Sequence, residues 1–87
     1  MDKKAVAQAM MNLEKSLREG QLALMFEYMD ELEDLAGEAY MMKVLSTLAR
    51  SLPDSPLVQI YIEPILRGHP EEYEAFFGIK VEKPGGE

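Results

Sequence analysis

The amino-acid sequence predicts an all-α protein, a small bundle of four main helices plus a short fifth, arranged as two antiparallel helical hairpins. Apolar residues recur at intervals of three and four along most of the chain, which is the spacing of one helix face. Most glycines and prolines fall between these stretches, and the connections they leave are short, as in helical hairpins. We expect residues 1–78 to form a single helical domain and residues 79–87 to form an extended or disordered tail.

The first two helices are predicted to form one hairpin. Asp2 can cap the first helix, whose apolar residues recur until Gly20 ends it. The second helix follows almost at once, from Gln21 to Ala36, and Gly37 ends it. Because so few residues connect the two helices, they must fold back on each other.

The second helix has a wider apolar surface than one packed face requires. Its main stripe follows the helical repeat and consists of Leu22, Met25, Phe26, Met29, Leu32 and Ala36. Leu24, Tyr28 and Leu35 widen this stripe along one edge. The apolar arc then covers about half of the circumference, against roughly 100° for an ordinary surface helix. We therefore expect this helix to be central, with more than one neighbour, and Leu24, Tyr28 and Leu35 to form a partner interface.

A third helix is predicted from about Glu38 to Leu52, with one apolar and one polar face. The apolar face consists of Met41, Leu45, Leu48 and Leu52, and the expected outer positions are Lys43, Ser46 and Arg50. Met42 lies off the apolar face. The loop that follows contains two prolines around Asp54 and Ser55, either of which can cap the next helix.

The segment 57–67 is compatible with two structures. Its apolar spacing suits a helix, whereas its β-branched residues and the internal Pro64 also suit a strand that ends at Glu63. We favour a helix that is kinked or interrupted near Pro64, because the cap before it is strong. A last short helix is expected at residues 70–77, followed by an extended segment at residues 79–81.

The sequence is similar to itself at an offset of 35 residues, which aligns Leu13 with Leu48 and Phe26 with Tyr61. A true repeat of two hairpins explains this alignment, and so do any two amphipathic hairpins with similar loops. The period and shape are similar to those of tetratricopeptide repeats. The small residues of that family are absent, however, with Leu13 and Met25 near their places. The sequence therefore assigns no family.

Composition narrows the classes of function. The chain has 87 residues, no cysteine and a net charge of −7, which excludes disulfides and thiolate sites and fits a cytoplasmic location. No basic face is visible that would neutralise phosphates, so we expect no nucleic-acid binding. Uncharged runs such as 20–26 and 55–62 are too short to span a bilayer, and no secretory signal is recognisable. We therefore expect no association with membranes.

An acidic contact strip follows the outer side of the second helix and consists of Glu27, Asp30, Glu31 and Asp34. No Lys or Arg occurs between Arg18 and Lys43. The strip can bind a basic protein, hold a divalent cation weakly, or be a solvated helix face, which is the usual state of such charges. Glu33 falls within the apolar arc, so we expect it either at a wet edge or paired with a cation.

The chain offers few groups for catalysis or metal binding. His69 is the only histidine, and with Glu72 it would supply two metal ligands without a second His or Cys to complete a transition-metal site. No phosphate-binding loop and no nucleophile elbow occur. We therefore expect no catalytic residue, no cofactor and no metal. The aromatic residues of the last helix either close the bundle or anchor a partner, and they are Tyr73, Phe76 and Phe77.

The sequence thus predicts a non-enzymatic protein–protein interaction module, most simply a homodimer formed through the wide apolar face of the second helix. The first alternative is a monomeric acidic adaptor that binds a basic protein partner. The second alternative is a small metal-binding protein.

Overall fold

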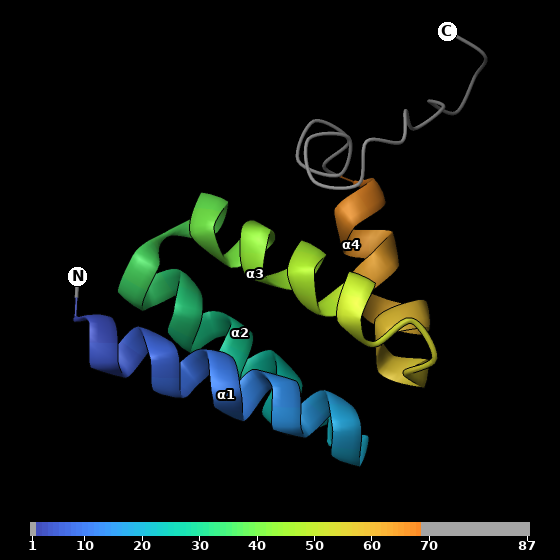
Figure 1. The fold of residues 1–87 in the computed structure, drawn as a ribbon. Coiled ribbons are helices and arrows are strands. Elements are labelled where there is room, and N and C mark those ends of the chain that lie inside the picture. The colour runs from blue at the N-terminus through green and yellow to red at the C-terminus, as the bar shows by residue number, and fades with distance from the viewer. Residues whose placement is uncertain (1, 69–87) are drawn as a thin grey trace, which may run out of the picture.

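A computed structural model describes residues 2–68 of the chain, and most of this range is helical (Figure 1). The elements are α1 (Lys3–Glu19), α2 (Leu22–Ala36), α3 (Glu38–Ser51), the π-helical segment η1 (Val58–Ile62) and α4 (Glu63–Arg67). No strand occurs among residues 2–68, so the predicted all-α class is confirmed there. The short helix expected at 70–77 and the tail at 79–87 lie outside the described residues.

The predicted ends of α1 are confirmed in detail. The Asp2 side chain accepts hydrogen bonds from the backbone N–H groups of Lys4 (3.0 Å) and Ala5 (3.2 Å). These bonds satisfy two of the donors that the first turn of a helix leaves free. At the other end Gly20 has φ +68°, in the left-handed region, and the next N–H, that of Gln21, donates to the Ser16 carbonyl (2.9 Å).

The helices pack in the order of the chain. α1 and α2 lie along each other as a hairpin, α3 packs on α2, and η1 and α4 pack on α3 (Figure 1). Apolar residues without exposed surface come from every part of this arrangement and include Leu13, Leu32, Leu45, Ile62 and Leu66. One continuous core therefore joins the hairpin to the later helices.

The most deeply packed helix is α3 rather than α2. α3 buries seven residues, whereas α2 buries three. The buried residues of α3 include two rows at helical spacing, which are Met41, Leu45 and Leu48, and Met42, Ser46 and Ala49. The helix predicted from Gln21 to Ala36 does have more than one neighbour, because α2 packs against both α1 and α3, but α3 has the wider buried arc.

Two residues of α3 lie on the opposite side from the one expected. Met42 is 1% exposed and Ser46 is fully buried, although the sequence placed both outside the apolar face. The Ser46 hydroxyl donates to the Met42 carbonyl oxygen (3.0 Å), so its polar group is satisfied within its own helix. A satisfied hydroxyl costs little to bury, which lets a serine occupy a packed position.

Residues 58–67, which follow the loop, are helical, so the helix favoured over a strand in this segment is confirmed. The Ser55 hydroxyl accepts a hydrogen bond from the Val58 N–H (3.4 Å), which confirms a cap before this segment. The Glu63 N–H donates to the Val58 carbonyl, five residues back, so the turn is wider than an α-helical turn. This wide turn directly precedes Pro64, whose ring would clash with the Ile60 carbonyl in a regular α-helix.

Gly20 provides a test of this fold. Replacing Gly20 with Ala should lower the free energy of unfolding by about 1–2 kcal/mol, because a Cβ is disfavoured in the left-handed region even where space is open. Gly20→Asn is the matched control and should cost less, since asparagine adopts this conformation more readily. Chemical denaturation followed by circular dichroism measures both. Equal losses for the two variants would contradict the left-handed cap.

Candidate interaction surface

The residues of the predicted partner interface lie along one flank of α2. Leu24 is 38% exposed, whereas Tyr28 and Leu35 are half-buried and pack against the core. Spacings of four and seven residues place the three side chains on one line along the helix. Of the three, Leu24 offers the most apolar surface to a partner.

The acidic contact strip lies in solvent. All four of its carboxylates are exposed, and so is Glu33, which therefore occupies a wet edge. α2 contains no Lys or Arg, so these charges have no neutralising side chain on their own helix. The strip separates the Leu24 flank of α2 from the flank that carries Phe26, because Asp30 and Asp34 fall between the two in the helical repeat.

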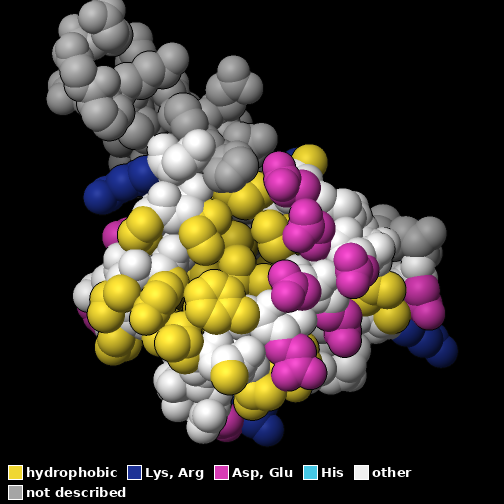
Figure 2. All heavy atoms as spheres, turned by 180° about the vertical axis from the view of Figure 1, so that it is seen from behind, with side chains coloured by type: hydrophobic (Ala, Val, Ile, Leu, Met, Phe, Trp, Pro, Cys, Tyr) yellow, Lys and Arg dark blue, Asp and Glu magenta, His cyan; other side chains and the backbone are white. Residues whose placement is uncertain are grey.

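A second apolar surface lies on the flank of α2 that faces η1. Phe26 is 42% exposed and Ile60 is 62% exposed, and the half-buried Tyr61 lies between the two helical segments. The rings of Phe26 and Tyr61 meet edge to face, with centroids 5.8 Å apart and planes at 82°. We call Phe26, Ile60 and Tyr61 the aromatic patch. Figure 2 shows apolar side chains gathered on this side of the molecule, with a row of acidic side chains beside them.

Sequence reasoning missed the aromatic patch. It assigned Phe26 to the packed stripe of its helix and did not single out Ile60. One signal was available for Phe26: the residues four and seven positions later on the same line are Asp30 and Glu33, which indicates an edge of the stripe and not its centre. A similar signal was available for Ile60, because Val58, Ile62 and Leu66 follow one another at four-residue spacing and Ile60 falls on the opposite side of the helix.

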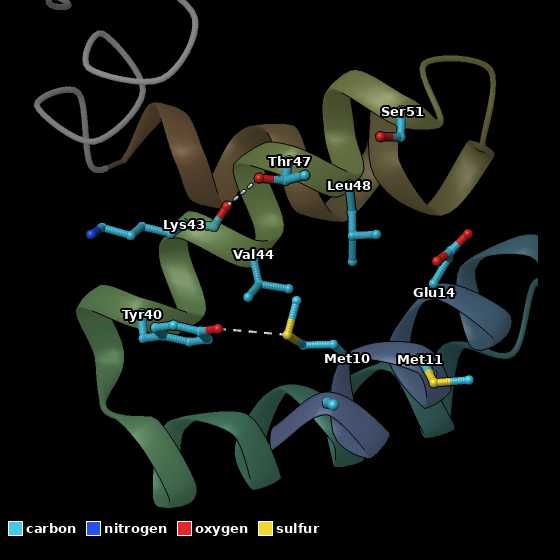
Figure 3. A pocket seen from close by; sticks show the side chains of 10 residues that line it. Met10, Met11, Glu14, Tyr40, Lys43, Val44, Thr47, Leu48 and Ser51 are labelled. Carbon is cyan, nitrogen blue, oxygen red and sulfur yellow. Dashed lines mark hydrogen bonds between the residues drawn. The ribbon is translucent and has the colours of Figure 1, made fainter. Parts of the chain in front are cut away.

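The other side of the molecule carries an open groove of about 600 Å³ between α1 and α3 (Figure 3). Its apolar walls include Met10, Val44 and Leu48, and Met11 lies at its edge. The Tyr40 hydroxyl reaches the Met10 sulfur (3.8 Å) and so connects the two helices. None of the predicted interface residues lines this groove.

The charged groups of the groove do not converge. Figure 3 shows the Lys43 ammonium pointing away from the groove and Glu14 at its other end. Glu14 is engaged by Arg18, with the guanidinium 2.7 Å from the carboxylate. What the groove offers a ligand is therefore apolar contact.

Among residues 2–68 there is no cluster of three or more His, Cys, Asp or Glu side chains that could hold a metal ion. His69 and Glu72, and the aromatic residues Tyr73, Phe76 and Phe77, lie outside the described range. In the same range no helix has the length and apolar content needed to cross a membrane.

Comparison with known proteins yields no match, whether to a protein-family model, to a curated protein or to a solved structure. The function is therefore argued from the chain's own residues.

The contact between Phe26 and Tyr61 can be tested by a double-mutant cycle. Phe26→Leu and Tyr61→Leu should show a coupling energy of about 0.5–1.5 kcal/mol, because the edge-to-face contact is lost in either single variant. Chemical denaturation of the two single variants and the double variant measures it. Phe26→Leu combined with Tyr40→Leu is the control and should be additive, since Tyr40 reaches Met10 instead. A coupling near zero for the first pair would contradict the contact.

Proposed function

We propose that this protein is a non-enzymatic protein–protein interaction module whose contact surface is α2 with its two flanks. The supporting observation is that apolar side chains are exposed on both flanks of this helix, Leu24 on one and Phe26 on the other, with the acidic contact strip between them. Apolar surface beside charge is the usual composition of a contact surface with a polar rim. A helix with only polar side chains on its exposed side would not support this role.

The first partner is a second copy of the chain. Leu24, supported by the half-buried Tyr28 and Leu35, offers an apolar line that a twofold axis can bring against itself. The acidic contact strips then lie at the border of the contact, where water and salt screen them. This arrangement gives a homodimer of modest stability.

Substitutions on the Leu24 flank test the homodimer. Leu24→Gln together with Leu35→Gln should weaken association at least about tenfold while helix content stays largely intact, because the contact loses two apolar side chains. Light scattering on a sizing column over a range of concentrations measures the mass. Leu57→Gln replaces another half-buried leucine, away from this flank, and should leave association unchanged. Association that survives the double substitution would remove this flank from consideration.

The second candidate function is an acidic adaptor for a basic protein. The observation that favours it is the exposure of every carboxylate of the strip on a helix without a basic residue. Such a surface attracts a positively charged partner and accelerates its association.

Charge-matched variants test the adaptor function. Neutralising Glu27, Glu31 and Asp34 to the corresponding amides should weaken the binding of an oligolysine peptide several-fold, because each exposed ion pair contributes up to about 1 kcal/mol. The control neutralises Glu19, Glu38 and Asp54, which changes the net charge equally but lies outside the strip. Isothermal titration at low salt measures both. Equal losses in the two variants would mean that only the net charge attracts the peptide.

A further inference from the structure

The two most exposed large apolar side chains of residues 2–68 are Met11 (64%) and Ile60 (62%). Met11 lies on α1 and Ile60 lies on η1. Neither side chain belongs to the hydrophobic core or packs against it. Ile60 belongs to the aromatic patch. Met11 lies in the middle of the outer face of α1, since the residues on the opposite side of this helix, such as Leu13 and Leu17, are buried.

Charged residues accompany each apolar side chain at the same spacing but with opposite sign. On α1, Lys15 and Arg18 follow Met11 at four and seven residues. On α2, Asp30 and Glu33 follow Phe26 at four and seven residues. In both helices these steps correspond to about 6 Å and about 10.5 Å along one line of the surface. Two helices that lie side by side and parallel would therefore align each cation with a carboxylate.

All the charged groups involved are accessible. Lys15, Asp30 and Glu33 are exposed, and so is Arg18, whose ion pair with Glu14 lies at the surface. An exposed ion pair of this kind contributes little free energy. Arg18 can therefore leave Glu14 and pair with another carboxylate at a small cost in free energy.

We propose that copies of this chain associate head to tail, with the outer face of α1 in one copy (Met11, Lys15 and Arg18) docked on the aromatic patch and adjoining carboxylates of the next (Phe26, Ile60, Asp30 and Glu33). Met11 packs against Phe26 and Ile60, and a methionine adapts well to an aromatic surface. The contact is heterologous, because it joins two different surfaces, so each copy keeps one of each surface free for a further copy.

This inference rests on the proposed role as an interaction module but not on the Leu24 flank. Leu24, Tyr28 and Leu35 take no part in the head-to-tail contact. A twofold contact centred on the aromatic patch is disfavoured, since it would bring Asp30 and Glu33 of both copies together.

Charge reversal tests the proposal with the intact chain. One variant carries Asp30→Lys and Glu33→Lys, and the other carries Lys15→Glu and Arg18→Glu. Each variant alone should associate at least about tenfold more weakly than the original chain, because every contact then opposes like charges. An equimolar mixture of the two should recover association, since the reversed surfaces are complementary again. Sedimentation velocity over a range of concentrations measures all four samples.

Two exposed apolar positions test the rest of the contact. Met11→Ser and Ile60→Ser should each weaken association several-fold without loss of folding, because both side chains lie mostly in solvent. Gln59→Ser replaces an exposed neighbour of Ile60 on the same element and should have no effect.

The outcomes separate this inference from the homodimer. If neither charge reversal weakens association, or if the mixture fails to recover it, the head-to-tail contact is overturned. If in addition Leu24→Gln with Leu35→Gln abolishes association, the homodimer stands alone. If the charge-reversed mixture recovers association and the Leu24 and Leu35 substitutions have no effect, the head-to-tail contact stands and the Leu24 flank is not an interface.

Discussion

The packing of α3 is the constraint on which the rest of the described structure depends. Its buried arc is wide enough to contact α2 on one side and η1 with α4 on another. This arc includes Ser46, whose hydroxyl bonds to its own helix, and the small Ala49, so neighbouring helices can approach closely. α2 packs against both α1 and α3 but buries only three of its residues. The apolar surplus of α2 consequently lies at the surface, where a partner can reach it.

The wide turn of η1 lets the helix continue into Pro64. Pro64 cannot follow a regular helical turn without a clash, and the wider turn before it removes that conflict. Val58, Ile62 and Leu66 nevertheless remain buried together, four residues apart. Ile60 lies on the side opposite this buried line, in solvent, and the Tyr61 ring lies against Phe26.

Local features of the fold could be predicted from the sequence, and features that depend on a neighbouring helix could not. Asp2, Gly20 and Ser55 set helix ends through bonds to residues within a few positions, so their roles are visible in the sequence. The exposure of the acidic contact strip could also be predicted from the sequence. The burial of Ser46 depends on which helix packs where, and a helical repeat alone does not contain that information.

The net charge of −7 is distributed unevenly along the chain. Its excess negative charge is concentrated on α2, whereas lysines and arginines are more frequent on α1. At physiological salt, interactions beyond about 8–10 Å are largely screened, so the net charge opposes association only weakly. Contacts within a few ångströms depend instead on the charges that meet there. The segregation of charge between α1 and α2 is therefore compatible with the proposed contact of α1 in one copy with α2 in the next.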